Sequence, residues 1–194
     1  MCCEARAAVT QQLVTDFMNE RVVYLMRGLP SCGKSFTARQ LAGDSGVVLE
    51  TDEFFRAQQG GTIVYRYREE LLPQARRWNL ERFETALASE VSPIVVDRGN
   101  GRNRESSDYA SRAVALGCHV ELKEPGSPWW QEIRRLLQDK QQNAAQLELW
   151  SGRLAELSRQ THRVPQSTIY RWMQSWKADL TVEDILRIEP HAPA

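Results

Sequence analysis

Residues 28–35 match the pattern G-x-x-x-x-G-K-[ST], and this match restricts the possible folds of the chain more than any other part of the sequence. An apolar, β-type run precedes the match at 22–26, and a helical pattern follows it at 36–41. A strand, a glycine-rich turn and a helix form the context in which this pattern binds phosphate. The glycines let successive backbone N–H groups converge on an anion, and the start of the helix adds positive charge. We therefore predict a nucleotide-phosphate site at this loop.

Individual residues of the loop have distinct expected roles. Lys34 should reach the β- and γ-phosphates of a nucleotide, and the Ser35 hydroxyl should face Mg²⁺. Cys32 allows two interpretations, a redox switch beside the phosphates or a small residue tolerated at a variable position, and the second is the simpler. The predicted nucleotide-binding residues are Gly28, Pro30, Ser31, Cys32, Gly33, Lys34, Ser35 and Phe36.

The bulk composition limits the classes of partner. A chain of 194 residues suits one α/β domain, and its formal net charge is zero. Zero net charge argues against a broad electrostatic grip on duplex DNA or on an anionic membrane. The start of the chain lacks an apolar stretch long enough for a signal peptide or membrane span. The four cysteines form no C-x-x-C pair, so we expect a reducing, cytoplasmic setting.

Strand patterns and helix patterns alternate along the chain. Such alternation predicts an α/β fold in which helices cover both faces of a parallel sheet, a three-layer sandwich with four to five strands. We expect a helical extension at 1–20 and a single domain at 21–194 with a helical C-terminal region. The strands are predicted at about 21–26, 47–50, 93–97 and 119–123.

The predicted helices are bounded by recognisable start and stop signals. Gly43 should end the helix after the loop, and Pro73 should kink or restart a long helix over about 66–89. Ser127 before Pro128 predicts a helix start, and Thr181 with Asp184 resembles a capping pair. A turn is expected at 58–61. The remaining helices are predicted near 106–117, 128–142, 144–160, 166–178 and 182–188.

Asp52 follows the second predicted strand, and we expect it to face the acceptor of a transferred phosphate. Ligands of parallel sheets lie beyond the carboxyl ends of the strands, where the loop 28–35, Asp52 and 97–100 all fall. A carboxylate there can orient a hydroxyl and take its proton late, although an ordinary Asp pKa of about 3.9 is too low for prior deprotonation. The alternative is that Asp52 caps the following helix.

Asp97 and the basic loop after it are the other candidate site residues. Asp97 ends an apolar strand and could bind magnesium directly or through water; a structural hydrogen bond to the phosphate loop is the alternative. Arg98, Arg102 and Arg104 could grip a phosphate on the acceptor, since arginine forks match phosphate oxygens. A solvated surface loop is the competing interpretation of these arginines.

Five motifs follow one another along residues 21–178. They are Gly28–Ser35, Thr51-Asp52-Glu53-Phe54-Phe55, Val95-Val96-Asp97-x-x-Asn100, Glu124-Pro125-x-x-x-Trp129 and His162-x-Val164-Pro165. In this order they resemble the P-loop polynucleotide 5′-kinase family and its close ATP-binding relatives. The resemblance implies a P-loop kinase fold with a helical lid, and transfer of phosphate from ATP to the 5′-hydroxyl of a nucleic acid.

The same resemblance implies roles for particular residues. Lys34 and Ser35 would serve ATP and magnesium, Asp52 would activate the acceptor, and Asn100 would belong to the acceptor loop. Arg159 is the best match to the lid arginine that stabilises charge on the transferring phosphoryl group. The chain departs from the family pattern at Arg76, at Arg98-Gly99, at Arg163 and in an apparent insertion at about 138–152. The donor side therefore matches the family better than the acceptor side does.

Three hypotheses about function follow. The first is an ATP- and Mg²⁺-dependent kinase whose partners are a nucleotide and single-stranded nucleic acid 5′ ends, or a nucleotide-like alcohol. The second is a small-molecule kinase on the same fold, in which the arginine loop grips an anionic metabolite. The third is a nucleotide-dependent binding switch with slow hydrolysis, in which the insertion and lid contact a partner.

Overall fold

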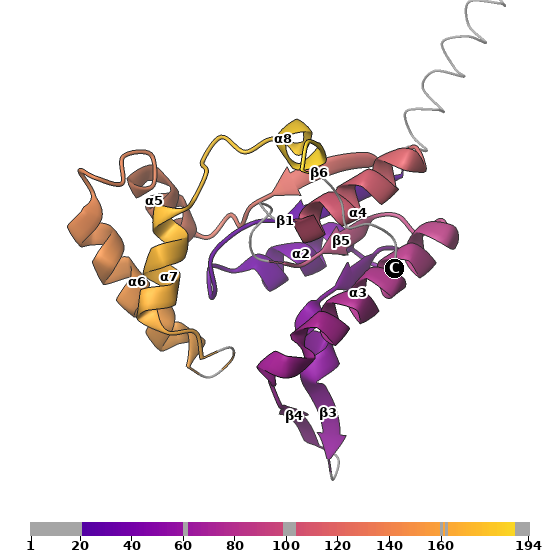
Figure 1. The fold of residues 1–194 in the computed structure, drawn as a ribbon, viewed down its shortest axis with the longest axis horizontal. Coiled ribbons are helices and arrows are strands. Elements are labelled where there is room, and N and C mark those ends of the chain that lie inside the picture. The colour runs from indigo at the N-terminus through magenta and orange to yellow at the C-terminus, as the bar shows by residue number, and fades with distance from the viewer. Residues whose placement is uncertain (1–20, 60–61, 99–103, 160, 162, 189–194) are drawn as a thin grey trace, which may run out of the picture.

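A parallel sheet of four strands, in the order β2-β5-β1-β6, forms the centre of the computed structural model (Figure 1). The structure describes residues 21–59, 62–98, 104–159, 161 and 163–188. The sheet strands are β1 (Val22–Met26), β2 (Val47–Leu49), β5 (Ile94–Val96) and β6 (His119–Lys123). Leu25 pairs with Val96 on one side and with Leu122 on the other, so the three strands are in register. The predicted parallel sheet of four to five strands is confirmed with four.

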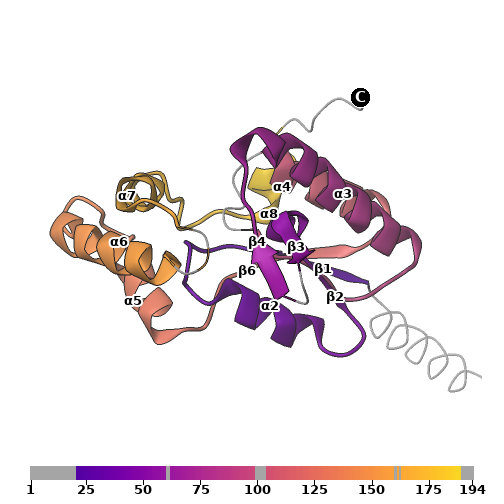
Figure 2. The same cartoon turned by 90° about the horizontal axis from the view of Figure 1, so that it is seen from below.

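Helices cover both faces of this sheet, as Figure 2 shows. Helix α2 (Lys34–Ala42) packs Ala38 and Ala42 against Met26 and Val95 on one face. The opposite face is covered by α3 (Leu72–Ala88), α4 (Arg104–Ala115) and α8 (Val182–Leu186), whose buried residues include Phe83. A parallel sheet buried on both faces needs apolar strands, which these sequences supply. The predicted three-layer α/β sandwich is confirmed.

Three further helices form a second group beside the sheet (Figure 1). They are α5 (Pro128–Leu136), α6 (Ala144–Ser158) and α7 (Gln166–Gln174). Their shared core contains Leu29 and Cys32 from the phosphate loop, in addition to buried side chains of the three helices such as Trp130. This group therefore packs directly on the loop, and we refer to α5, α6 and α7 together as the lid. No helix among the described residues is both long enough and apolar enough to cross a bilayer.

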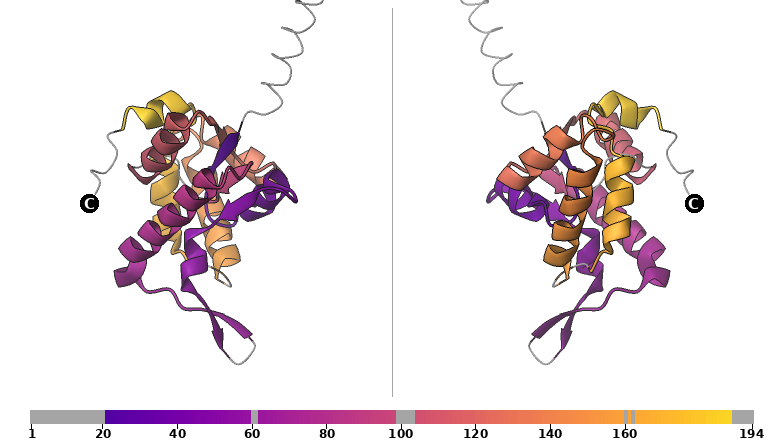
Figure 3. Two further views of the ribbon diagram at one scale, coloured as in Figure 1. Left: turned by 90° about the vertical axis from the view of Figure 1, so that its right-hand side faces the viewer. Right: turned by 90° about the vertical axis from the view of Figure 1, so that its left-hand side faces the viewer.

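An antiparallel hairpin that the sequence did not predict follows β2. The short 3₁₀ helix η1 (Thr51–Phe55) leads into β3 (Arg56–Gln59), which pairs with β4 (Thr62–Tyr65). The turn predicted at 58–61 is therefore wrong for Gln58 and Gln59, which belong to β3; residues 60–61 lie outside the described part. Figure 3 shows the hairpin projecting from the rest of the molecule.

The helix boundaries confirm the local signals and correct the lengths. Ser127 Oγ accepts from the Trp130 amide, and Thr181 and Asp184 form a reciprocal capping box. Pro73 lies in the first turn of α3, which follows the 3₁₀ helix η2 (Glu69–Leu71) and begins at Leu72 rather than near residue 66. The C-terminal helices are shorter than predicted; α5, for instance, ends at Leu136. The extension expected at 1–20 lies outside the described residues.

Candidate functional site

The phosphate loop has backbone angles that favour glycine at two of its positions. Gly28 and Gly33 have φ values of +146° and +96°, and Ser31 is also left-handed at +59°. A Cβ added at Gly28 would lie 2.5 Å from Cys32 Sγ, closer than two such atoms approach. The loop curls tightly because glycine occupies these two positions. The pattern match therefore has the local geometry of a phosphate cradle.

Helix α2 begins directly at the end of this loop. Gly33 is its N-cap residue and carries no side chain that could bond to the first-turn amides. Unsatisfied amides at a helix start, together with the helix dipole, favour an anion. Lys34 Nζ donates to the Leu29 carbonyl at 2.7 Å and lies 3.9 Å from Cys32 Sγ, so its ammonium is folded over the loop. Ser35 follows in the first turn of α2.

The lid supports the loop from outside. Ser127 Oγ donates to the Cys32 carbonyl at 2.8 Å, and Trp129 Nε1 donates to the Ser31 carbonyl at 3.2 Å. These bonds hold loop carbonyls toward the lid. The sequence marked Ser127 only as a helix cap, and its second role needed knowledge of the tertiary packing.

Cys32 belongs to the core of the lid. Its side chain is fully buried with Leu29 and lid residues such as Trp130. Burial raises the pKa of the Cys32 thiol, and the nearby Lys34 ammonium only partly opposes this shift. A buried thiol that stays protonated is a poor nucleophile. The structure therefore favours a packing role for Cys32 over a redox switch.

A buried ion pair at the base of the loop was not predicted from the sequence. Arg27 is 3 % exposed and pairs with Glu124 Oε1 at 3.1 Å. Its guanidinium carbon lies over the Trp176 ring, 4.2 Å from the ring centroid. Glu124 Oε2 also accepts from Trp130 Nε1 at 3.2 Å and Arg134 at 2.9 Å. Burial lowers the pKa of Arg27, and Glu124 opposes that shift. This network joins the end of β1 to the first helix of the lid.

Asp52 lies in η1, immediately beyond the carboxyl end of β2. It is the second residue of η1, whose N-cap residue is Glu50, so the capping interpretation of Asp52 does not match the structure. Its carboxylate accepts a hydrogen bond from the Tyr65 hydroxyl of β4. Burial raises the pKa of Tyr65, and the charge of Asp52 raises it further. Tyr65 was missed because the hairpin that carries it was missed.

Asp97 follows β5, the strand between β2 and β1. Its backbone amide donates to the Leu49 carbonyl at 3.0 Å, and its Oδ1 is buried without a hydrogen-bond partner among the described residues. Burial raises the pKa of the neighbouring Glu50, and the charge of Asp97 raises it further. A buried, unpartnered carboxylate oxygen fits a magnesium ligand or a ligand to a magnesium-bound water.

A magnesium site here would use few protein ligands. No group of three or more His, Cys, Asp or Glu side chains suited to a metal occurs in the part of the chain that the structure describes. Magnesium commonly keeps several waters and takes one or two protein oxygens besides the substrate phosphates. Ser35 and Asp97 are compatible with that pattern.

Of the arginines expected to bind the acceptor, Arg98 is the one whose side-chain contacts the structure describes. The Arg98 side chain is 15 % exposed and forms an ion pair with Glu105, which also pairs with Arg76 at 2.5 Å. An acceptor phosphate would have to compete with Glu105 for the Arg98 guanidinium. Arg104 is the first residue of α4, while Asn100 and Arg102 lie outside the described residues.

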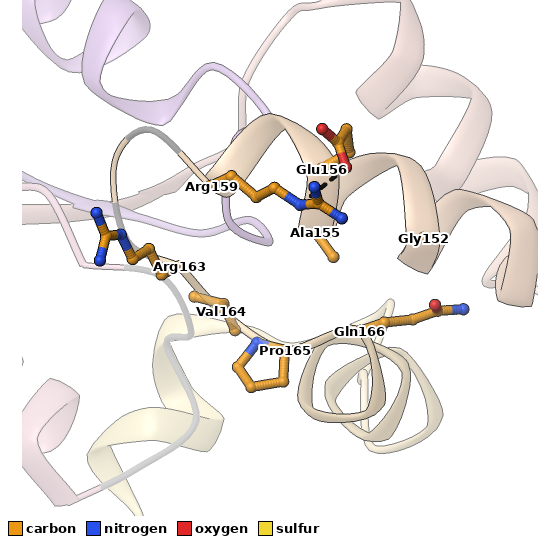
Figure 4. Close-up of a pocket in the computed structure, with 8 residues that line it drawn as sticks. All are labelled: Gly152, Ala155, Glu156, Arg159, Arg163, Val164, Pro165 and Gln166. Carbon is orange, nitrogen blue, oxygen red and sulfur yellow. Dashed lines mark ion pairs between the residues drawn. The ribbon is translucent and has the colours of Figure 1, made fainter.

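Arg159 is the C-cap residue of α6, directly after Ser158, the last residue of that helix. Its side chain is 74 % exposed and pairs with Glu156 at 2.9 Å. Figure 4 shows both residues at a pocket of about 550 Å³ between the end of α6 and the start of α7. Arg163, which has a left-handed φ of +50°, and Val164 line the same pocket.

The site residues lie at the carboxyl ends of three neighbouring strands. Asp52 follows β2, Asp97 follows β5 and the phosphate loop follows β1, in the order in which these strands lie in the sheet. The sequence predicted that these segments share one edge of the sheet, and the strand order puts Asp97 in the middle. Such an edge is where parallel α/β sheets bind ligands.

Two comparisons with known proteins agree with this architecture. NEDD4-binding protein 2 of Homo sapiens is 36 % identical over 111 residues, which is 56 % of this chain and 6 % of that protein. The family described as AAA domain, AAA_33, matches residues 23–163, more than half of the chain. This chain therefore belongs to the AAA_33 family of AAA domains and is a P-loop nucleotide-binding protein of kinase-like fold.

Proposed function

We propose that this protein is an ATP- and Mg²⁺-dependent kinase that transfers the γ-phosphate to a hydroxyl acceptor, with a polynucleotide 5′-hydroxyl as the favoured acceptor. One observation carries the proposal. The phosphate loop, Asp97 and Asp52 follow three neighbouring strands, and this order supports the proposal of a donor site, a metal ligand and an acceptor-facing carboxylate along one edge. Phosphoryl transfer depends on this kind of positioning and charge neutralisation.

The phosphate loop, which follows β1, would hold the phosphate donor ATP. Amides of the loop and of the first turn of α2 would bind the phosphates, and Lys34 would exchange the Leu29 carbonyl for phosphate oxygens. Ser35 and Asp97 would hold the magnesium, which neutralises charge on the phosphates when it is bound. Arg159 would add positive charge at the transferring group after leaving Glu156.

Asp52, which follows β2, would receive the acceptor. Its carboxylate would accept a hydrogen bond from the acceptor hydroxyl and orient the oxygen toward the γ-phosphorus. A new oxygen–phosphorus bond then forms as the bond from the γ-phosphorus to the bridging oxygen breaks. The hydroxyl proton passes to Asp52 and ADP is the leaving group.

A small phosphorylated alcohol is the second candidate acceptor. Zero net charge supports it, because extended nucleic acids usually meet a basic surface. The ion pair of Arg98 with Glu105 also supports it, since this pair leaves less free positive charge for a polynucleotide backbone. The order of motifs along the chain supports the polynucleotide.

The test is transfer of labelled γ-phosphate from ATP to a short 5′-hydroxyl oligonucleotide and, separately, to small phosphorylated alcohols. Lys34→Ala removes the loop lysine. Lys177→Ala is the matched control, because Lys177 pairs with Asp184 in α8. Label on the oligonucleotide that is lost only in Lys34→Ala supports the proposal. Label confined to small alcohols supports the second candidate, and Lys34-dependent ATP binding without any transfer supports a nucleotide switch and contradicts a kinase.

A further inference from the structure

The hairpin β3–β4 returns the chain to Asp52. Arg56, at the start of β3, pairs in register with Tyr65, at the end of β4. The Arg66 amide donates to the Phe55 carbonyl at 2.8 Å, which fastens the end of β4 to the end of η1. The Tyr65 ring meets Phe55 edge-on with 6.2 Å between the ring centroids. Tyr65 is thus fixed by backbone pairing and by ring packing on the element that carries Asp52.

The hydroxyl of Tyr65 donates a hydrogen bond to the Asp52 carboxylate. Because burial and the Asp52 charge both raise the pKa of Tyr65, this hydroxyl keeps its proton at neutral pH and remains a donor. A carboxylate has two oxygens and about four acceptor positions. The Tyr65 hydroxyl takes one of these positions, and in the proposed reaction the acceptor hydroxyl would use another.

We propose that Tyr65 is a positioning residue for Asp52, holding the carboxylate in the orientation that receives the acceptor hydroxyl. The inference rests on the proposed function, in which Asp52 orients the acceptor. Phosphoryl transfer needs the attacking oxygen in line with the bond that breaks, and a small misplacement of a catalytic group costs rate. Tyr65 belongs to the hairpin β3–β4, which is part of neither the central sheet nor the phosphate loop.

Tyr67 provides a matched control two residues further along. Its ring also packs on Phe55, with 5.0 Å between centroids, and is 49 % exposed. Tyr67→Phe and Tyr65→Phe each remove one hydroxyl and keep a ring on Phe55. The two variants therefore differ in the hydrogen bond to Asp52 and are alike in their packing against Phe55.

The first measurement is steady-state phosphoryl transfer by the full chain with the acceptor found active. Tyr65→Phe should lower kcat about 10-fold to 100-fold with KM values for ATP and acceptor within about twofold, whereas Tyr67→Phe should match the wild type. In an Asp52→Ala background, Tyr65→Phe should cause no further loss, because there is no carboxylate left to position. An unchanged kcat in Tyr65→Phe, or an equal loss in the Asp52→Ala background, would overturn the inference.

A second measurement does not depend on activity. The χ1 rotamer of Asp52, measured by NMR three-bond couplings, should be single in the wild type and in Tyr67→Phe, and averaged in Tyr65→Phe. A single unchanged rotamer in Tyr65→Phe would refute the positioning role even if the protein transfers phosphate. An averaged rotamer in a protein without transfer would instead contradict the proposed function and leave the contact between Tyr65 and Asp52 established.

Discussion

Gly28 determines how closely the phosphate loop can curl. Gly28→Ala would bring a Cβ to 2.5 Å from Cys32 Sγ at a φ of +146°, so the loop must open or Cys32 must leave the lid core. We expect a loss of about 1–3 kcal/mol in the free energy of unfolding and weaker ATP binding by about 10-fold or more. Urea titration and nucleotide titration measure the two effects.

Gly126→Ala is the control for that substitution. Nothing among the described residues lies within 4 Å of a Cβ added there, although its chain neighbours Pro125 and Ser127 lie beside Gly33 of the loop. It should bind ATP and unfold like the wild type. Gly28→Ala behaving like Gly126→Ala would show that the curl of the loop is not needed.

Cys32 should be slow to react with alkylating reagents. Burial raises its pKa, so less thiolate is present at pH 8 than for an exposed cysteine, and the lid core shields the sulfur. Site-resolved mass spectrometry after iodoacetamide treatment measures the rate. The same cysteine in urea-unfolded protein is the reference, and equal native and unfolded rates would contradict the burial described here.

The candidate site residues that the sequence identified are those marked by local chain geometry. The spacing of Gly28, Gly33 and Lys34 defines a loop by itself, and Asp52 was selected as a candidate because it directly follows a predicted strand. Tyr65 and Arg27 could not be identified in this way. Each acts through a partner on another element, and pairing between elements is absent from a local pattern.

Among the secondary-structure elements, the start of α5 is linked to the phosphate loop by its N-cap residue, Ser127. Ser127→Ala removes the N-cap bond to the Trp130 amide and the 2.8 Å bond to the Cys32 carbonyl. We expect a loss of about 1 kcal/mol in the free energy of unfolding together with weaker ATP binding. Thermal or urea unfolding and nucleotide titration give both values.

Thr181→Ala is the matched cap substitution, because Thr181 caps α8 with the same kind of bond to the Asp184 amide. Its loss of stability should be similar, and its ATP affinity should equal that of the wild type. If both variants weakened ATP binding equally, the effect would arise from general destabilisation and not from support of the loop.

The helix boundaries agree with the sequence prediction where a single glycine, proline or capping residue determines the boundary. Gly43, Pro73, Ser127 and the Thr181–Asp184 pair all mark ends or starts that the structure confirms. The hairpin was missed because the stretch 56–62, rich in glutamine and glycine, lacks the alternation of apolar residues that predicts strands. The pairing of β3 with β4 is stabilised at the base of the hairpin by the hydrogen bond from the Arg66 amide to the Phe55 carbonyl.

Across the whole molecule, the Arg27–Glu124 network joins the sheet to the lid, because Glu124 also accepts from Trp130 and Arg134 of α5. Glu124→Gln would leave the buried Arg27 charge without its carboxylate and weaken the bonds from Trp130 and Arg134. We expect a loss of about 3 kcal/mol in the free energy of unfolding, since breaking a buried pair leaves an uncompensated charge. Urea unfolding measures this loss.

Glu156→Gln is the surface comparison, because Glu156 pairs with Arg159 where both side chains are mostly exposed. Its cost should be below about 1 kcal/mol. Equal losses in the two variants would contradict the buried network as the connection between the sheet and the lid.

In the proposed reaction Asp52 acts on the acceptor while the phosphate loop holds the donor, and the substitution Asp52→Asn separates these two roles. Single-turnover transfer from ATP should fall about 100-fold or more in Asp52→Asn, with the ATP Kd within about twofold of the wild type. Asp44→Asn, an exposed carboxylate at the other end of β2, should change neither value. Transfer by Asp52→Asn at the wild-type rate would show that Asp52 does not act on the acceptor.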